Sequence, residues 1–207
     1  MSAEYCRMAP SHPFHGPYHD REYGFPARED RVLFERLVLE INQAGLSWLT
    51  VLQKRQAFAA AFVDYDLERI AAFDARDVAR LLADPGIIRN RLKVAAVIEN
   101  AKRLIALRRS HGSFAQWLDA HHPRAKADWV KLFRGTFKFT GGEIVGEFLM
   151  SLGYLPGAHV PSCAVHRRVL ALNPPWSGQS PMRARSAAAR KSAGATASKK
   201  KSRKAKK

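Results

Sequence analysis

Several features that mark other protein classes are scarce or missing in this sequence of 207 residues. Only two cysteines occur, Cys6 and Cys163, so the disulfide framework of small secreted domains is not expected. No apolar run approaches the roughly 20 residues of a membrane-spanning helix, and the first residues do not follow the order of a signal peptide. Convincing runs of alternating apolar and polar residues are also missing. These absences favour an all-α protein of the cytoplasm with no membrane contact.

Acidic residues are few as well: 18 Asp or Glu stand against 35 Lys or Arg, for a net charge of +17. Residues 174–207 hold 11 of the basic residues and no acidic one, and they offer no apolar face. We expect residues 1–173 to form one globular domain and residues 174–207 to be a disordered basic tail. Such a charge balance is typical of proteins that bind nucleic acid. The tail itself suits a nonspecific DNA tether or a segment that only improves solubility.

Most apolar residues recur at helical spacing. The spacing predicts a helix over 31–43, with Gly45 as a stop signal, and a second helix from the N-cap Ser47 to about Phe62. Further helices are predicted over 66–72, 74–83, 87–109, 113–121, 129–133 and 143–152. In the long helix over 87–109, Leu92 and Ala95 are among the residues expected to face inward. Residues 1–30 and the segment after 153 show no clean period and are expected to be irregular.

Glu40 lies at the edge of the apolar stripe of the helix predicted over 31–43. An ionised carboxylate near a core is costly unless a charged or polar group pairs with it. Trp48 follows eight residues later, after the break at Ala44 and Gly45. The pair indicates a flat, electron-poor or cationic ligand. The simpler alternative is a solvated glutamate and an ordinary core tryptophan.

Cysteine and histidine residues are spaced so that they are compatible with a metal site. Twelve residues separate Cys6 from His19, and three separate His159 from Cys163. Two cysteines and two histidines can complete a tetrahedral zinc site, although each half also arises by chance. One zinc ion would clasp two irregular ends of the chain together. With four protein ligands, such an ion would be structural.

Six motifs occur in order along the chain, and together they identify a family. They are Tyr18-His19-Asp20-x-Glu22, Leu39-Glu40, Gln43-Ala44-Gly45-Leu46-Ser47-Trp48, Gly86-Ile87-Ile88-Arg89, Phe137-Lys138-Phe139 and His159-x-x-x-Cys163. Over residues 6–169 the chain resembles DNA-3-methyladenine glycosylase I, a branch of the helix-hairpin-helix superfamily. The resemblance implies a helix-hairpin-helix fold and a monofunctional base-excision repair enzyme. Its substrate would be 3-methyladenine in DNA, a cationic alkylated purine whose N-glycosidic bond is hydrolysed.

The resemblance also assigns roles to residues of the base pocket. Glu40 corresponds to the catalytic pocket carboxylate, which hydrogen-bonds the alkylated base. Tyr18 and Trp48 correspond to the aromatic residues that hold that base. Met8 stands where the family often has a tryptophan, so a polarizable thioether replaces one aromatic contact. Tyr23 likewise replaces a frequent tryptophan.

Two further sites follow from the same resemblance. One structural zinc ion would be held by Cys6, His19, His159 and Cys163. The segment 137–142 falls at the family's hairpin, so its backbone would contact DNA phosphates through Lys138, Gly141 and Gly142. The alternative for Lys138 is an ordinary exposed lysine.

The implied partner is double-stranded DNA with alkylated bases, bound by a monomer near the nucleoid of a bacterial-type cytoplasm. Three acids, Asp128, Glu143 and Glu147, are candidates for guiding the attacking water, and each also suits a helix cap or a surface charge. An alternative interpretation retains the zinc site and the basic surface but assigns no catalytic activity to the protein. In that case the chain would be a DNA-binding or damage-recognition protein without catalysis.

Overall fold

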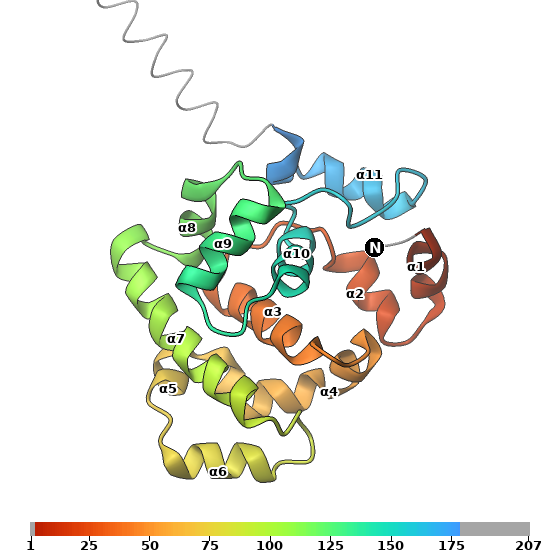
Figure 1. Ribbon diagram of the computed structural model, residues 1–207. Helices are drawn as coiled ribbons and strands as arrows, with labels where there is room; N and C mark the ends of the chain where they lie inside the picture. Colours follow the sequence, from red (N-terminus) through yellow and green to blue (C-terminus); the bar gives the residue numbers. More distant parts are fainter. Residues whose placement is uncertain (1–2, 179–207) are drawn as a thin grey trace, which may run out of the picture.

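The protein, described by a computed structural model over residues 3–178, is helical (Figure 1). The helices are α1 Ala3–Met8, η1 Ala9–Ser11, α2 His15–Arg21, α3 Asp30–Gln43, α4 Trp48–Ala61, η2 Val63–Tyr65, α5 Leu67–Ala71, α6 Ala75–Ala83, α7 Arg91–His111, α8 Phe114–His121, α9 Lys126–Thr136, α10 Gly142–Ser151, α11 Ala164–Ala171 and η3 Pro175–Ser177. No strand occurs in this range, which confirms the all-α prediction. None of the described helices combines the length and the apolarity that a membrane crossing requires.

Helix α3 runs through the centre of the molecule (Figure 1). It packs against α4 and α7 on one side and against α8 and α10 on the other. Nine of its side chains are buried, so the buried surface of this helix is wider than the predicted apolar stripe. Polar side chains in its second half, such as Glu40 and Asn42, therefore lie inside the protein.

Side-chain caps set the starts of several helices where the sequence predicts them. Ser47 accepts a hydrogen bond from the backbone N–H of Thr50 at 3.1 Å, at the start of α4. Asp66 caps α5 in the same way. Asp74 and Asp77 form a reciprocal capping box at the start of α6. Each cap satisfies backbone donors that have no partner within the helix.

Helix α7 begins at Arg91, four residues later than predicted. Asn90 is its N-cap and accepts hydrogen bonds from the backbone N–H groups of Leu92 and Lys93 at 3.0 and 3.1 Å. The expectation that Leu92 and Ala95 face inward is wrong. Leu92 is 69% exposed and Ala95 is exposed too, because both lie off the face of α7 that packs against α3 and α5.

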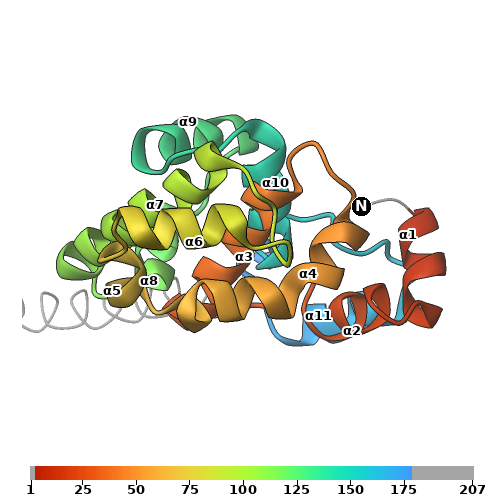
Figure 2. The ribbon, with the colours of Figure 1, turned by 90° about the horizontal axis from the view of Figure 1, so that it is seen from below.

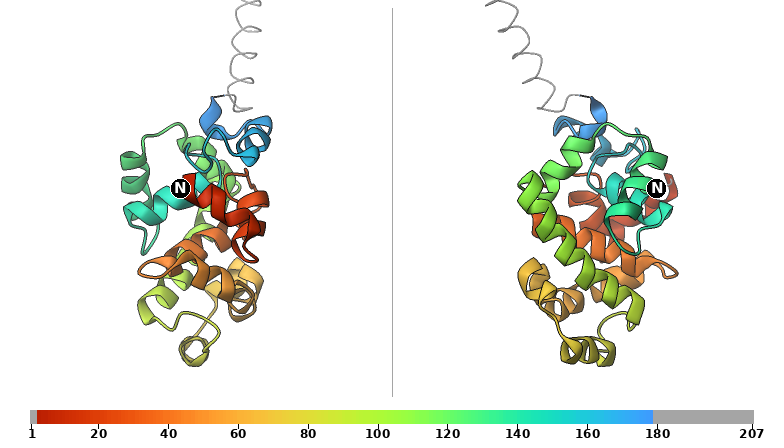
Figure 3. Two further views of the ribbon diagram at one scale, coloured as in Figure 1. Left: turned by 90° about the vertical axis from the view of Figure 1, so that its right-hand side faces the viewer. Right: turned by 60° about the vertical axis from the view of Figure 1, so that its left-hand side comes forward.

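The expectation of irregular chain in residues 1–30 and after 153 holds for 22–29 and 154–163 and is wrong for the segments that precede the first of these ranges and follow the second. Helices α1 and α2 and the 3-10 helix η1 fill most of residues 3–21, and α11 covers residues 164–171. These three α-helices have six to eight residues each, too few to show a helical period in the sequence. Figures 2 and 3 show α1, α2 and α11 side by side, so segments from opposite ends of the chain meet.

The last described residues lie against the body, although the sequence places them at the start of the tail. Pro174 is buried, and the backbone N–H of Trp176 donates to the carbonyl oxygen of Gly153 at 3.0 Å. The Nε2 atom of His122 lies 3.0 Å from the carbonyl oxygen of Pro175. The rest of the predicted tail, 179–207, lies outside the described residues.

Candidate functional site

A cavity of about 400 Å³ opens between α1, α2, α3, α4 and α10. Aromatic and acidic side chains dominate its lining, which consists of Tyr5, Met8, His15, Tyr18, Tyr23, Glu40, Gln43, Trp48, Glu143 and Glu147. A second hollow of similar size shares Glu40, Gln43 and Glu143 with it and continues along residues 44–47. The four residues predicted for the base pocket therefore lie around one cavity. Such a lining suits a flat ligand that carries positive charge.

Glu40 is the buried acid of this cavity, and not the helix-margin residue that the sequence suggests. Its side chain is 3% exposed, and within residues 3–178 its Oε2 atom has no hydrogen-bond partner. Burial raises the pKa of Glu40 well above its usual range, the charge of Glu147 raises it further, and Arg36 opposes the rise. A cation bound beside the carboxyl group would oppose this rise, because an opposite charge favours the ionised form.

Tyr18 and Trp48 form an aromatic corner of the cavity. Their ring centroids are 5.0 Å apart and their planes are inclined at 59°. The indole Nε1 of Trp48 is buried and lacks a hydrogen-bond partner in the described part of the chain. Burial, followed by the charge of Glu40, raises the pKa of the Tyr18 hydroxyl. Two electron-rich faces, an indole N–H and a carboxyl group together can hold a flat cationic ring.

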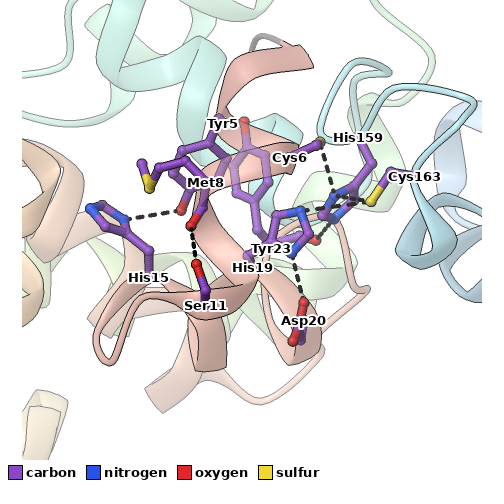
Figure 4. A network of polar contacts seen from close by, with 10 residues as sticks. All are labelled: Tyr5, Cys6, Met8, Ser11, His15, His19, Asp20, Tyr23, His159 and Cys163. Carbon is purple, nitrogen blue, oxygen red and sulfur yellow. Dashed lines mark hydrogen bonds and ion pairs between the residues drawn. The ribbon is translucent and has the colours of Figure 1, made fainter.

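Two residues of the cavity wall, Tyr5 and His15, escaped the sequence reasoning, and Tyr23 is marked there only as the replacement of a frequent tryptophan. The rings of Tyr5 and His15 meet edge to face at 5.4 Å, and the Tyr5 hydroxyl lies 3.3 Å from the His15 Nδ1 atom (Figure 4). Tyr23 is fully buried, with its ring 5.6 Å from that of Tyr18. Met8, which the sequence did predict, lies at the wall with 43% of its surface exposed.

The three acids proposed as guides for water differ in their placement. Glu147 lines the cavity, and the Tyr23 hydroxyl donates a hydrogen bond to its Oε2 atom at 2.8 Å. The Glu143 side chain is 91% exposed at the rim and pairs with a lysine. Asp128 lies on α9, half exposed, and also pairs with a lysine. Glu147 alone of the three is both in the cavity and held by a buried partner.

Two cysteines and two histidines gather where the chain ends meet (Figure 4). The ligand atoms of Cys6, His19, His159 and Cys163 all lie within 4.8 Å of one another. The Sγ atom of Cys163 lies 3.7 Å from His19 Nε2 and 3.9 Å from His159 Nδ1. The sulfur of Cys6 lies 3.9 Å from the same His159 nitrogen. The structure thus brings together all four predicted metal ligands.

The outer nitrogens of both histidines are held by protein groups. His19 Nδ1 lies 2.7 Å from the Asp20 carboxylate, and His159 Nε2 lies 2.7 Å from the carbonyl oxygen of Tyr23. Donation through these nitrogens leaves the opposite nitrogen of each ring as a lone-pair donor toward the sulfurs, as in protein metal sites. Burial lowers the pKa of His159 to about 4, which keeps the ring neutral. Burial raises the pKa of the Cys6 thiol, so a bound cation is what would hold it as thiolate.

The predicted DNA contacts lie on the segment between α9 and α10. Lys138 is exposed, and the Asn100 side chain holds its backbone, accepting from the N–H at 2.7 Å and donating to the carbonyl at 3.1 Å. Gly141 is the N-cap of α10 and makes no side-chain cap. From Gly142 the helix continues inward to Glu147, so the same element joins this segment to the cavity.

A family model described as Methyladenine glycosylase matches residues 8–132 of the chain. The chain belongs to the methyladenine glycosylase family. The DNA-3-methyladenine glycosylase 1 of Escherichia coli (strain K12) is 34% identical over 182 residues, which cover 79% of this chain and 97% of that protein. The DNA-3-methyladenine glycosylase of Haemophilus influenzae is 32% identical, with 70% of this chain and 89% of the relative covered.

Solved structures of the family share the fold. A crystal structure of 3-methyladenine DNA glycosylase I has a TM-score of 0.69 at 35% identity and covers 77% of this chain and 97% of its own. The structure of the Staphylococcus aureus enzyme, solved to explain 3-methyladenine recognition, has a TM-score of 0.71 at 29% identity, with 80% and 97% covered. These matches confirm the helical glycosylase fold that the motifs predict.

Proposed function

We propose that the protein is a DNA glycosylase that hydrolyses the N-glycosidic bond of 3-methyladenine in DNA. The observation that carries this proposal is the buried carboxyl group of Glu40, which shares one cavity with the rings of Tyr18 and Trp48. Membership of the family and the names of its relatives support the same reaction. The ligand of this cavity is the alkylated base, turned out of the helix stack.

Methylation at N3 makes adenine cationic, and the cavity residues favour a cation in two ways. Each aromatic face contributes about 0.5–2 kcal/mol of attraction to a positive ring. The ionised form of Glu40, which a neighbouring cation stabilises, adds a charge-assisted hydrogen bond. Unmodified adenine is neutral and gains neither contribution in full. Glu40, Tyr18, Trp48 and Met8 would therefore select the damaged base.

The cationic base is a good leaving group, so the reaction needs little acid catalysis. Cleavage would pass through an oxocarbenium-like sugar that water attacks. The lining of the cavity contains no lysine among the described residues. An attack by an amine with strand nicking is therefore not expected, and the enzyme would be monofunctional.

The backbone of the target strand would lie along the segment before α10. Lys138 offers an exposed positive charge, and the N-terminus of α10 at Gly141 and Gly142 offers free backbone N–H groups for a phosphate. The side chain of Asn100 keeps this segment in place. A phosphate bound there would place the flipped nucleotide at the mouth of the cavity.

One structural zinc ion would be held by Cys6, His19, His159 and Cys163. Two sulfurs and two imidazole nitrogens suit a closed tetrahedral zinc site, which takes no part in the reaction. The ion would join α1 and α2 to the segment before α11. It would also fix the cavity walls, because Tyr5 and Tyr18 directly precede two of the ligands in the sequence.

We further propose that the enzyme acts as a monomer on alkylated duplex DNA in the cytoplasm, close to the nucleoid. Residues 1–173, extended by the packed residues 174–178, would form the glycosylase domain. The basic residues that follow would add unspecific affinity for DNA.

The reaction is tested by incubating the protein with methylated duplex DNA and separating the released bases by chromatography. We expect free 3-methyladenine to appear in amounts proportional to enzyme, above the spontaneous loss seen without protein. The DNA strands should stay intact until they are treated with alkali. Binding of methylated DNA without any released base would instead favour the non-catalytic DNA-binding protein.

Removal of residues 179–207 is expected to preserve excision and to weaken DNA binding. Every Lys and Arg of the predicted tail lies in this segment, so its loss reduces the number of phosphates that the chain neutralises. The plot of log affinity against log salt concentration should become less steep. A variant with a neutral Gly/Ser tail of equal length is the control. Loss of excision in both variants would show that the tail has a direct part in the reaction.

A further inference from the structure

The cavity contains a second acid besides Glu40. Glu147 comes from α10, and its carboxylate is near enough to Glu40 to repel the charge of that group. The Tyr23 hydroxyl donates to its Oε2 atom at 2.8 Å, so the carboxylate is held in one orientation through that oxygen. Tyr23 is itself rigid, since it is fully buried and its carbonyl oxygen pairs with His159 at 2.7 Å. A carboxylate held in one orientation at a cavity wall is suited to a specific role in the reaction.

The position of Glu147 along α10 indicates which part of the substrate its carboxylate would contact. The helix begins at Gly142, where a phosphate of the target strand is expected, and runs into the cavity. Glu147 lies five residues further on, about 7.5 Å along the axis. Glu40, on α3, lines the same cavity and is assigned to the base. Glu147 thus lies between the expected positions of the phosphate and the base, where the sugar of a flipped nucleotide must pass.

We propose that Glu147 is the carboxylate that acts on the sugar, an assignment that rests on the glycosylase function proposed above. Its negative charge stabilises the oxocarbenium-like centre at C1′ and it accepts a proton from the attacking water. The C1′–N9 bond breaks with its electron pair leaving on the now neutral 3-methyladenine. The water oxygen bonds to C1′, and one of its protons moves to Glu147. The products are the free base and an abasic sugar.

The test compares the single-turnover excision rate, at saturating enzyme, of the wild type, Glu147→Gln and Asp128→Asn. Glutamine still accepts the hydrogen bond from Tyr23 but cannot take the proton or carry the charge. We expect the rate of Glu147→Gln to fall about 100-fold, a typical contribution of a general base. Its affinity for a duplex with an abasic-site analogue should be unchanged. Asp128→Asn makes the same acid-to-amide change outside the cavity and should excise at the wild-type rate.

Chemical rescue separates a direct role from a structural one. Glu147→Ala leaves space for a small carboxylate, so added formate should restore part of the lost rate, and chloride at the same concentration should not. A full rate for Glu147→Gln would overturn the assignment, and so would a defect in DNA affinity alone or a failure of formate to rescue. Absence of released 3-methyladenine from the wild type would overturn the glycosylase function itself, and this assignment with it.

Discussion

Replacing Glu40 with Gln is expected to lower kcat/KM for the excision of 3-methyladenine about 10- to 100-fold. A hydrogen bond to a charged group is worth about 1.5–3 kcal/mol, and glutamine retains the shape of the side chain without its charge. The cationic base then lacks the negative charge of the Glu40 carboxylate, while Tyr18 and Trp48 still provide aromatic contact. Steady-state excision on methylated duplex DNA measures the effect.

The same substitution should leave the melting temperature unchanged or raise it at neutral pH. The pKa of Glu40 is raised in the folded state, first by burial, so the protein binds this proton more tightly when folded. Its favourable contribution is complete below the unfolded pKa and is lost as the pH rises through the folded pKa. Glutamine removes that pH dependence. A fall in activity together with a fall in melting temperature would contradict a role specific to the cationic base.

Purified wild-type protein is expected to contain one zinc ion per chain, and Cys163→Ser is expected to lose it. Binding of a structural zinc contributes several kcal/mol of folding free energy, so the melting temperature should fall on the order of 10 °C. Excision should fall as well, because Tyr5 and Tyr18 adjoin ligands of the same ion. Elemental analysis and thermal unfolding measure both effects.

His166→Asn is the matched control for the metal, since His166 lies three residues after Cys163 and outside the cluster. It should retain the zinc and the wild-type melting temperature. Treatment of the wild type with a chelator should reproduce the loss seen in Cys163→Ser. Full activity of a wild-type protein without any bound metal would rule out a zinc ion that joins the two ends of the described chain.

The sequence predicts the parts of the fold and site that depend on neighbours along the chain. Helix α3 and the start of α4 at Ser47 follow from local spacing and capping, and so they are correct. Glu40 and Trp48 lie close together in the sequence and are recognisable as a pair. The burial of Glu40 could not be predicted in this way, since α10, which packs against α3, comes from a distant part of the chain.

Other features could not be read from local pattern. The helices that carry Tyr5 and Tyr18 are short and lie in a segment rich in His and Pro, so no period identifies them. Tyr23 lines the cavity only because the fold brings α10 and the segment around His159 against it. In the sequence, Tyr23 is marked only by the family resemblance, in which it replaces a frequent tryptophan. The late start of α7 follows from the Asn90 cap, whereas the sequence pattern predicts that the helix begins at Ile87.

The two ends of the described chain meet at the cysteine and histidine cluster, and this has a consequence for synthesis on the ribosome. Cys6 and His19 emerge early, but they cannot be joined until His159 and Cys163 have followed. The lining of the cavity ends at Glu147, so all of its residues are synthesised before the cluster can be completed.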